Sequence, residues 1–403
     1  MQHSRYDVLI VGGGAAGFFT AINLAEARPE LRIAILERGK EVLQKVRISG
    51  GGRCNATHAC WEPRELTQYY PRGEKELLGP FHKFCTGDTV DWFETRGVAL
   101  KIEEDGRMFP VTDSSQTIID CFQTAVKQAG IQVLTSCNVT HIEAWEKGWK
   151  LSGPTQEWLA HKVVLAPGSS KQAWKMLEGL GHSIVEPVPS LFTFNCKDTR
   201  LRNRAGLSVA NAQVQVLDTD LSAEGPLLVT HWGLSGPAIL KLSAWGARKL
   251  HALNYKFRIQ VNFTGLEAEA AQEQIQEALS THAKKQLGNT PLFGIPKRLW
   301  QSLIPEALAQ QSCASLHAAA RQQLLKSVYA AEFNINGKST FKEEFVTAGG
   351  VELSEVDFRS MESKLHPGLY FTGEVLNIDA ITGGFNFQAA WTTAWLVARE
   401  LGA

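Results

Sequence analysis

The sequence lacks several patterns that would assign it to a simple class. No run of about 18 apolar residues occurs, so no membrane span is expected. The first residues have no long apolar segment after a basic head, so we expect no secretory signal peptide. The seven cysteines form no C-x-x-C pair and no His/Cys spacing typical of zinc. We therefore expect a cytoplasmic protein with free thiols, no metal site and no membrane association.

An excess of charge of either sign is also missing. The 41 Lys and Arg residues balance the 41 Asp and Glu residues. Nucleic-acid binding needs clustered positive charge, so this balance favours a small-molecule substrate and argues against a nucleic-acid partner. A chain of 403 residues allows two or three domains, and 44% hydrophobic residues with 35 glycines fit a globular α/β protein.

A glycine-rich motif follows the first predicted strand. Residues 6–11, YDVLIV, form a short apolar run typical of a buried parallel strand, and GGGAAG follows at once. A helical pattern comes next, then a predicted strand at 32–38, and Glu37 lies 20 residues after Gly17. A G-x-G-x-x-G sequence in this setting indicates a dinucleotide site.

Each residue of the motif has a physical role in such a site. Gly12 permits a tight turn, Gly14 lets the backbone approach a pyrophosphate, and Gly17 lets helix and sheet pack closely. The helix N-terminus offers free N–H groups to the phosphates. Glu37 can accept hydrogen bonds from an unphosphorylated ribose, which favours FAD or NAD over NADP. The cofactor-binding residues predicted here are Gly12, Gly14, Ala15, Ala16, Gly17 and Glu37.

The C-terminal segment 368–402 predicts a second part of the same site. A short strand, LYFTGEV, leads to a glycine turn and then a helical pattern. In two-part FAD folds such a segment supplies an acid for the ribityl hydroxyls and a helix N-terminus for the negative charge of the reduced flavin. The residues predicted to contact the cofactor are Gly373, Glu374, Asp379, Gly383, Gly384, Phe385 and Asn386.

A further strand agrees with this interpretation. HKVVLAPGSS, at 161–170, is similar to the strand that passes under the nucleotide in FAD-binding folds, with Ala166 and Gly168 at its end and Pro167 in place of the usual Thr. By the same analogy Val139 lies near the adenine. We find no second dinucleotide fingerprint, so any NADH or NADPH site must be built in another way.

Five long blocks resemble one bacterial flavoprotein family. They are VRISGGGRCNATH, VTHWGLSGPAILKLSAWGA, VTAGGVELSEV, MESK and GLYFTGEVLNIDAITGGFNFQAAW. They resemble the NAD(P)/FAD-dependent oxidoreductases related to the bile-acid Δ4,6-reductase and to aminoacetone oxidase. The resemblance implies an α/β fold: a discontinuous, Rossmann-like FAD-binding domain similar to that of fumarate reductases. The expected parts are residues 1–190, an inserted β-rich and helical domain at 191–343, and residues 344–403.

The same resemblance places SGGGRCN over the flavin ring. Glycines would let backbone N–H groups approach the ring, while Arg53 would offset charge on reduced flavin or substrate. Cys54 is either a redox-active thiol, activated by Arg53, or a small packing residue. Relative to the family blocks, Asn377 replaces an Asp, Ala380 a Gly and Phe385 a Tyr. The cofactor contacts expected in this loop are Ser49, Gly50, Gly51, Gly52 and Asn55.

The predicted insert alternates apolar and polar residues at first and becomes helical from about 266 to 330. His231 is either a proton donor to substrate or part of a structural turn. Ser235, with Pro237 just after it, predicts a capped helix start. Arg200, Arg202 and Arg204 alternate, as on a solvated strand face, with recognition of an acidic substrate or nucleotide as the alternative.

Together these features predict an FAD-dependent oxidoreductase that transfers a hydride from flavin to an enone-like organic acceptor, with NADH or NADPH as a possible donor. An oxidase reaction remains open. The alternatives from other classes are an FAD-dependent tRNA-modifying protein and a flavin-binding regulator without turnover. The sequence does not indicate an oligomeric state.

Overall fold

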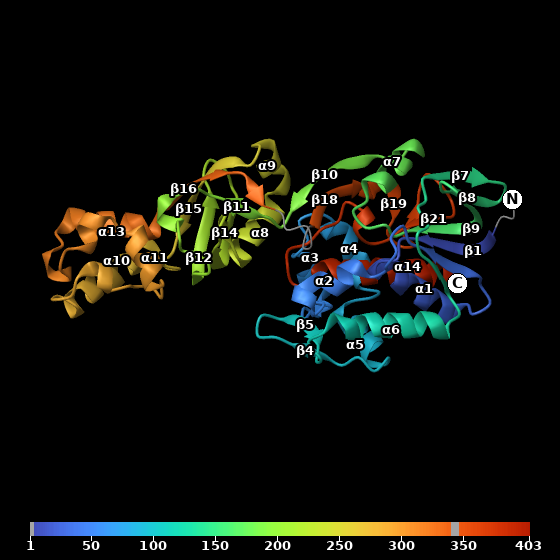
Figure 1. Ribbon diagram of the computed structural model, residues 1–403, viewed down its shortest axis with the longest axis horizontal. Coiled ribbons are helices and arrows are strands. Elements are labelled where there is room, and N and C mark those ends of the chain that lie inside the picture. Colours follow the sequence, from blue (N-terminus) through green and yellow to red (C-terminus); the bar gives the residue numbers. More distant parts are fainter. Residues whose placement is uncertain (1–3, 340–345) are drawn as a thin grey trace. The chain divides into compact units, whose positions relative to one another are not determined.

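The computed structural model describes residues 4–339 and 346–403, which belong to two compact units (Figure 1). Unit 1 comprises Met1–Val188 and Val346–Ala403, and unit 2 comprises Pro189–Phe345. The sequence-based boundaries were 190/191 and 343/344. Among the described residues, no helix is long and apolar enough to cross a bilayer.

Unit 1 is built on a mixed sheet with the strand order β19-β20-β21-β9-β1-β2-β6 and the hairpin β7–β8 beside β9. The strands β6, β2, β1, β9 and β21 run parallel. Parallel strands are covered on both faces, which explains why β2 and the second half of β1, Val8–Val11, are wholly apolar and buried. The strands are β1 (Ser4–Val11), β2 (Ile33–Leu36), β6 (Gln132–Leu134), β7 (His141–Trp145), β8 (Gly148–Ser152), β9 (Glu157–Leu165), β19 (Val356–Asp357), β20 (Glu362–Ser363) and β21 (Leu369–Phe371).

Helices α1 (Ala15–Ala27) and α14 (Phe385–Gly402) pack against each other (Figure 1). Because both are largely enclosed, their sequences are apolar or small on most sides. The remaining helices of the unit are α2 (Gln44–Gly52), α3 (Pro63–Thr67), α4 (Glu74–Phe81), α5 (Thr86–Glu94), α6 (Ser115–Gln128), α7 (Lys171–Gly179), η4 (Leu353–Glu355) and η5 (Gly373–Val375). Two small sheets join β3 (Thr57–His58), β4 (Leu100–Ile102) and β5 (Arg107–Pro110), and β10 (Ile184–Ser190) with β18 (Val346–Val351).

Unit 2 has a seven-stranded sheet with the order β16-β15-β12-β13-β14-β11-β17. Its paired strands are antiparallel and alternate buried with exposed residues, as the sequence pattern predicts. The strands are β11 (Thr193–Asn195), β12 (Ser208–Val216), β13 (Ser222–Val229), β14 (Gly233–Ser235), β15 (Lys256–Asn262), β16 (Ala331–Asn336) and β17 (Lys338–Ser339).

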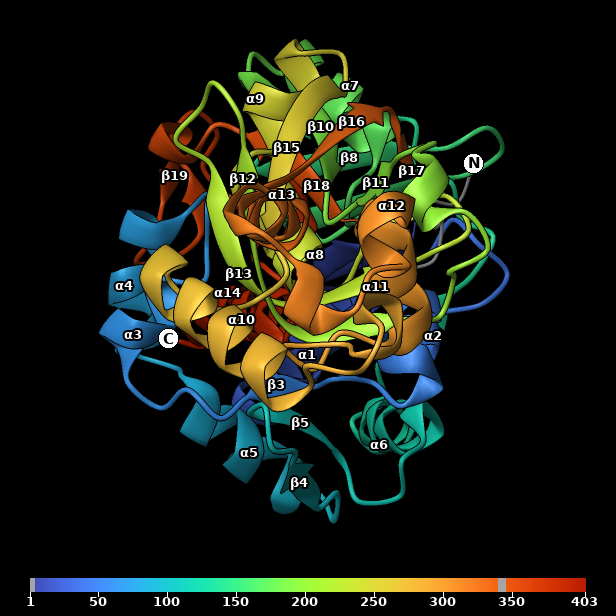
Figure 2. The ribbon, with the colours of Figure 1, turned by 90° about the vertical axis from the view of Figure 1, so that its left-hand side faces the viewer.

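A helical group completes unit 2. Figure 2 shows α10 to α13 in front of the strands of the same unit. The helices of the unit are α8 (Pro237–Trp245), α9 (Ala247–Ala252), α10 (Ala268–Thr281), α11 (Lys297–Leu303), α12 (Glu306–Ala309), α13 (Ala318–Tyr329), η1 (Thr199–Leu201), η2 (Leu287–Asn289) and η3 (Cys313–Ser315).

Two local predictions in unit 2 were wrong. The N-cap of α8 is Gly236, with Pro237 at the first helical position, and Ser235 gives no side-chain cap. A glycine takes the cap position because its φ of +94° favours a residue without a Cβ. Arg200 lies in the 3₁₀ turn η1, so the three alternating arginines do not share a strand face.

Candidate functional site

The glycine motif forms the turn between β1 and α1. Gly12 has φ of +116°, and a Cβ there would lie 2.1 Å from the carbonyl oxygen of Ala166. A Cβ on Gly17 would lie 2.0 Å from the carbonyl oxygen of Gly12. The fold itself therefore requires these two glycines, one for the turn and one for close packing of helix on strand.

Gly14 is different, because nothing in the fold demands a glycine there. Its φ is −95°, which any residue adopts, and a Cβ would meet no atom within 4 Å. The open space lies at the N-terminus of α1, where the N–H groups of Ala15, Ala16 and Gly17 have no intrahelical acceptor. These donors and this space fit the pyrophosphate of a dinucleotide.

Glu37 stands just after β2 and faces the same turn. Its two carboxylate oxygens accept hydrogen bonds from the backbone N–H groups of Gly13 (2.8 Å) and Gly39 (2.6 Å). Each oxygen keeps a second lone pair for a ribose hydroxyl. The N–H of Cys137 donates to the Glu37 carbonyl at 2.8 Å, so the segment that leads to buried Val139 runs beside Glu37. This placement agrees with an adenosine site.

The end of β9 meets the glycine turn, since the N–H of Ala166 donates to the Val11 carbonyl at 2.8 Å. Gly168 follows with φ of +63° and lies close to Glu374. Glu374 forms an ion pair with Lys45, a residue that the sequence analysis did not single out. Lys45 and Glu374 are 329 positions apart in the sequence, so no local sequence pattern could indicate this ion pair.

The loop SGGGRCN continues from α2 in a left-handed conformation. The helix is regular only up to residue 48, because Ser49 is extended and Gly50 and Gly51 have φ of +57° and +68°. A Cβ on Gly50 would meet Phe109, whereas Gly51 and Gly52 (φ +84°) face open space. The three glycines thus supply a turn, and Gly51 and Gly52 expose bare backbone at the surface.

Cys54 does not fit the role of a reactive thiolate. Its side chain is fully buried, and burial raises the pKa of the thiol to about 12. The thiolate is the reactive form of cysteine. The raised pKa opposes the alternative in which Arg53 activates Cys54 as a redox thiol, and it supports the packing alternative.

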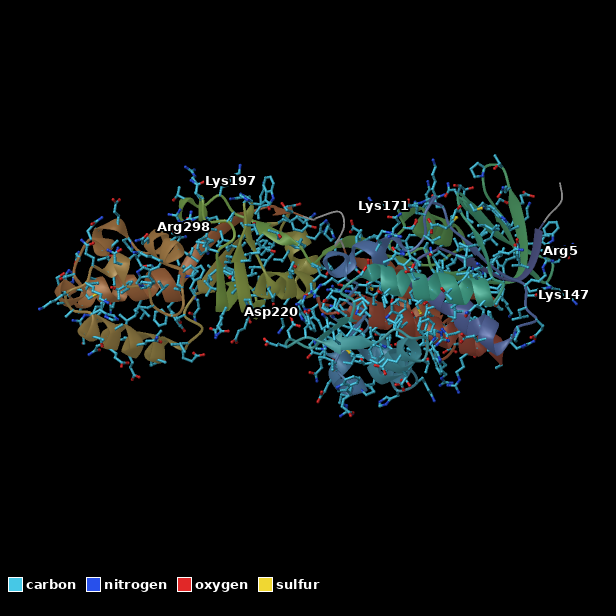
Figure 3. The ribbon with its side chains drawn as sticks, turned by 60° about the horizontal axis from the view of Figure 1, so that its bottom comes forward. Arg5, Lys147, Lys171, Lys197, Asp220 and Arg298 are labelled. Atoms are coloured by element: carbon cyan, nitrogen blue, oxygen red, sulfur yellow. The ribbon has the colours of Figure 1, made fainter. Side chains whose placement is uncertain are left out.

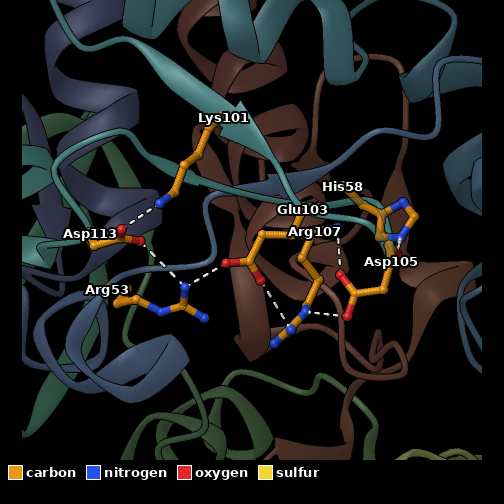
Figure 4. A network of polar contacts seen from close by, with 7 residues as sticks. All are labelled: Arg53, His58, Lys101, Glu103, Asp105, Arg107 and Asp113. Carbon is orange, nitrogen blue, oxygen red and sulfur yellow. Dashed lines mark hydrogen bonds and ion pairs between the residues drawn. The ribbon is translucent and has the colours of Figure 1, made fainter.

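Arg53 belongs to a network of charges around β4 and β5 (Figure 4). Its guanidinium donates to Glu103 at 2.6 Å and to Asp113 at 3.3 Å, and it stacks on the Phe109 ring at 3.9 Å. Lys101 pairs with the same Asp113. These carboxylates already compensate the charge of Arg53, which opposes the prediction that it balances charge on reduced flavin or substrate.

Two buried oxygens near the glycine loop and the C-terminal segment have no hydrogen-bond partner. They are Oδ1 of Asn55 and Oδ1 of Asn377. A buried acceptor without a donor costs roughly 1–3 kcal/mol, so such atoms call for a partner from outside the chain. Hydroxyl or N–H groups of a flavin cofactor are donors of the required kind.

The C-terminal segment lies against both the N-terminal motif and the residues that follow the glycine loop. Gly373 has φ of +72°, and its Cβ would lie 3.1 Å from that of Ala16. Gly383 has φ of +138°, and a Cβ on Gly384, the N-cap of α14, would lie 2.4 Å from the Thr57 carbonyl oxygen. The structure thus brings the two ends of the chain together, with the N-terminus of α14 next to residues 56–58.

Asp379 has a different role from the one predicted. Its carboxylate is fully buried and forms a bidentate ion pair with Arg72. We therefore reassign Asp379 from a ribityl contact to a structural residue, whose ion pair with Arg72 holds the C-terminal loop in place. Asn386 is also a brace, since its amide bonds both the N–H and the carbonyl of Ala380.

Phe385 is buried in an aromatic stack and does not offer its ring to a ligand. Its ring stacks on both His58 and Tyr69, with centroid distances of 4.5 Å and 4.3 Å, and these two rings lie 5.8 Å from each other. Burial lowers the pKa of His58, whose Nε2 lies 3.1 Å from the Asp105 carbonyl oxygen. His58 and Tyr69 were not among the predicted site residues, although His58 lies only three residues after the glycine loop.

His231 is exposed in the turn between β13 and β14 of unit 2. The hydroxyl of Thr230 accepts hydrogen bonds from the N–H groups of Trp232 (3.3 Å) and Gly233 (3.1 Å), which shape this turn. These contacts involve backbone and Thr230, so the imidazole of His231 is not needed to form the turn.

With this geometry established, the chain can be placed in a family. It belongs to the HI0933-like proteins, whose Rossmann domain matches residues 6–400. The expected family, with its relation to bile-acid Δ4,6-reductase, is confirmed, and the protein is an FAD-dependent oxidoreductase.

Two curated relatives cover nearly the whole chain. The ribosomal RNA dihydrouridine synthase of Escherichia coli K12 is 29% identical over 412 positions, with 98% of each chain covered. The 3-dehydro-bile acid Δ(4,6)-reductase of Clostridium scindens is 27% identical over 408 positions, with 97% of each covered.

Among solved structures, the 3-ketosteroid-Δ4-(5α)-dehydrogenase of Rhodococcus jostii RHA1 matches with a TM-score of 0.54 and 13% identity. The match covers 100% of this chain and 98% of that one. At this identity the likeness concerns the fold alone. It confirms the expected fumarate-reductase-like FAD fold with an added domain.

Proposed function

We propose that the protein catalyses FAD-dependent reduction of a carbon–carbon double bond that is conjugated to a carbonyl group, with NADH or NADPH as the electron donor. The FAD fit rests chiefly on Gly14, whose open Cβ position lies at the free N–H groups of α1. The acceptor class rests on a feature that the two curated relatives share.

That shared feature is the chemistry expressed by their names. A dihydrouridine synthase saturates the ring double bond of uridine, which is conjugated to a ring carbonyl. A 3-dehydro-bile acid Δ(4,6)-reductase acts on double bonds conjugated to the 3-oxo group. Both reactions add a hydride and a proton across an enone-like system, which supports the enone-like acceptor for this chain.

Bound FAD, once reduced by NADH or NADPH, would supply the hydride for this reaction. The protein would supply the binding groups: Glu37 for the ribose, the N–H groups at the start of α1 for the pyrophosphate, and two unused buried acceptors, Asn55 of the glycine loop and Asn377 of the C-terminal segment. The N-terminus of α14, which has no side-chain cap, carries partial positive charge and would stabilise negative charge on a reduced flavin ring.

The proton must come from an acid of the protein or from water. Burial lowers the pKa of His58, which keeps its ring neutral near pH 7 and makes it a poor proton donor. His231 is exposed, and its ring is not used to build its turn. We therefore keep His231 as the proposed proton donor.

The test begins with an anaerobic absorbance titration of the holoprotein with NADH and then NADPH. Bleaching of the flavin bands supports a pyridine-nucleotide donor. The reduced protein is then mixed with 2-cyclohexenone, with a 4-en-3-one steroid and with uridine-containing RNA. Return of the oxidised spectrum with at least one of them supports the proposed acceptor class, and no return with any of them contradicts it.

The His231→Gln variant tests the proton donor in the same experiment. Flavin content and its reduction by the donor should stay unchanged, whereas reoxidation by the conjugated acceptor should slow by about 10²-fold or more. The matched control is His251→Gln, which changes a histidine elsewhere in the same unit. Equal reoxidation rates for wild type and His231→Gln would return His231 to a structural role.

A further inference from the structure

The zero net charge of the chain hides an asymmetry between the two units. Residues 189–345 contain 17 Lys and Arg against 12 Asp and Glu, while the rest of the chain contains 24 against 29. The inserted unit therefore carries a net charge of +5, and the FAD unit carries −5. A ligand of polyanionic character would be attracted to the insert.

Much of this positive charge is gathered around η1 and the start of α11. The guanidinium of Arg204 donates to the Arg298 carbonyl at 2.8 Å, and that of Arg298 donates to the Asn203 carbonyl at 2.9 Å. These bonds hold the arginines together without neutralising them, because carbonyl groups carry no net charge. Figure 3 shows Lys197 and Arg298 toward the same edge of unit 2, with Asp220 away from it.

The acidic residue nearest in sequence to these cations, Asp198, is already paired with another arginine. Asp198 forms a bidentate ion pair with Arg200, at 2.9 Å and 2.8 Å. Within the part of the chain that the structure describes, no ion pair to a carboxylate is found for the other cations of this region. These cations are Lys197, Arg202, Arg204, Lys297 and Arg298, of which all but the half-buried Arg204 are exposed.

An exposed tryptophan adjoins these cations. Trp232 is 59% exposed, more than any other large apolar side chain in the described residues. Its carbonyl accepts a hydrogen bond from the N–H of Cys196 at 2.9 Å, which places Trp232 directly beside Lys197. The N–H of Gly206 donates to the Val229 carbonyl at 2.9 Å, so the loop after η1 also lies against this turn.

We propose that this basic surface, formed by Lys197, Arg202, Arg204, Lys297, Arg298 and Trp232, binds single-stranded RNA whose uridine is the substrate of the flavin site. The inference rests on the proposed function, since uridine is a conjugated acceptor of the class proposed above. Cations spaced along a surface bind backbone phosphates, and an exposed indole offers a face on which a base stacks. An acidic protein would use the same cations but would have no comparable use for the indole face.

The test measures binding of a fluorescein-labelled twelve-nucleotide oligouridylate to the holoprotein by fluorescence anisotropy, without reductant, over a series of salt concentrations. The charge variant is Lys197→Gln/Arg202→Gln/Lys297→Gln, three exposed side chains that hold no hydrogen bond in the structure. The matched control is Lys241→Gln/Lys256→Gln/Lys326→Gln, which removes the same charge from the same unit outside this surface. Trp232→Ala is compared with Trp245→Ala, a second exposed tryptophan of the unit (42% exposed).

We expect the charge variant to weaken RNA binding by about tenfold or more and to lower the slope of log K against log salt by about two to three. Trp232→Ala should weaken binding by about fivefold or more. Both controls should stay within about twofold of wild type. All variants should keep the flavin spectrum and thermal midpoint of the wild type, which shows that they are folded.

Equal RNA affinity of the surface variants and their controls would overturn the assignment. Competition by polyglutamate as strong as by unlabelled RNA, with no effect of Trp232→Ala, would assign the surface to an acidic protein and overturn it as well. The result is separable from the proposed function. If the surface does not bind RNA but an enone still reoxidises the flavin, the proposed function stands and its substrate is a small molecule. If RNA binds but no acceptor reoxidises the flavin, the proposed function is refuted and the RNA-binding surface is not.

Discussion

At the scale of single residues, glycines that look alike in the sequence have different reasons to be there. Gly12 and Gly17 are required by the backbone, whereas Gly14 faces open space. The motif G-x-G-x-x-G therefore predicted the turn because only glycine fits at two of its positions without a steric clash. Only the structure separates those positions from the one that a ligand explains.

We expect Gly14→Ala to lower FAD content strongly while leaving the fold intact. The added methyl group would meet no protein atom within 4 Å, but it would occupy the space assigned to the pyrophosphate. The measurement is the ratio of flavin absorbance to protein, together with the urea midpoint of the apoprotein.

Gly17→Ala is the informative comparison. Its Cβ would lie 2.0 Å from a backbone oxygen, so the apoprotein itself should be destabilised. If the Gly14→Ala apoprotein is as unstable as the Gly17→Ala apoprotein, the fold itself requires Gly14. The main support for a pyrophosphate site at the N-terminus of α1 would then be lost.

A buried histidine predicts a pH dependence. His182 has no exposed side-chain area and lies between Glu355 (2.8 Å) and the Ser363 hydroxyl (3.0 Å). The three groups have the order of a hydrolytic triad, but the serine is buried and accepts hydrogen bonds from Leu365 and His366, so it is no nucleophile. Burial lowers the pKa of His182, against the opposing effect of Glu355.

A lowered pKa means that the unfolded chain binds a proton more readily than the folded chain. Stability is therefore full above about pH 6.5, the ordinary value for histidine, and decreases as the pH falls below it. We expect the thermal midpoint of the wild type to fall between about pH 7 and 5.5, and that of His182→Gln to fall less. His141→Gln, which removes an exposed imidazole, should follow the wild-type curve; a parallel curve for His182→Gln would contradict the assignment.

At the scale of elements, the strands and the glycine turn of the FAD unit could be predicted because apolar runs and glycine spacing are local signals. The roles of Arg53 and Asp379 could not. Their partners are separated by 50 and 307 positions, and a pair of opposite charges has no preferred spacing in sequence once the chain is folded. A residue type that suits a cofactor equally suits a buried ion pair.

The Arg72–Asp379 ion pair should stabilise the fold by holding the C-terminal loop against the start of α4. The Asp379 side chain is fully buried and that of Arg72 is 14% exposed. Arg72→Ala removes the guanidinium that pairs with this buried carboxylate, which should lower the free energy of unfolding by about 3–5 kcal/mol. Urea unfolding measures this difference.

An exposed pair provides the control. Lys249→Ala breaks the pair with Asp220, whose side chain is 81% exposed, and should cost about 1 kcal/mol or less. The double variant Arg72→Ala/Asp379→Asn should recover part of the loss. If Arg72→Ala and Lys249→Ala lower the free energy of unfolding by similarly small amounts, the buried ion pair contributes little to stability.

At the scale of the whole molecule, the balanced composition conceals a difference in charge between the two units. A net charge of zero argued against RNA, yet the two units carry opposite net charges. Counting charge by domain, with the boundaries already expected from the sequence, would have revealed the basic insert. The exposure of Trp232 and the pairing of Asp198 could not be predicted, because both depend on packing.

The two-part architecture makes the last residues essential to the first unit. Strand β21 lies beside β9 in the parallel sheet, and α14 packs on α1. We expect a chain that ends at residue 345 to bind no FAD and to leave unit 1 without a cooperative unfolding transition. A truncated chain with bound flavin and native-like unfolding would show that residues 346–403 are dispensable for the fold.

This connectivity also has a consequence for biosynthesis. The ribosome completes the first 188 residues long before it makes β21 and α14, because the whole insert is translated in between. At about 5–20 residues per second the delay is on the order of ten to thirty seconds. During that interval the apolar edge of β9 and one face of α1 have no native cover, so the nascent chain should depend on chaperones. If the C-terminal segment completes the FAD site as proposed, FAD should bind only after this segment has emerged.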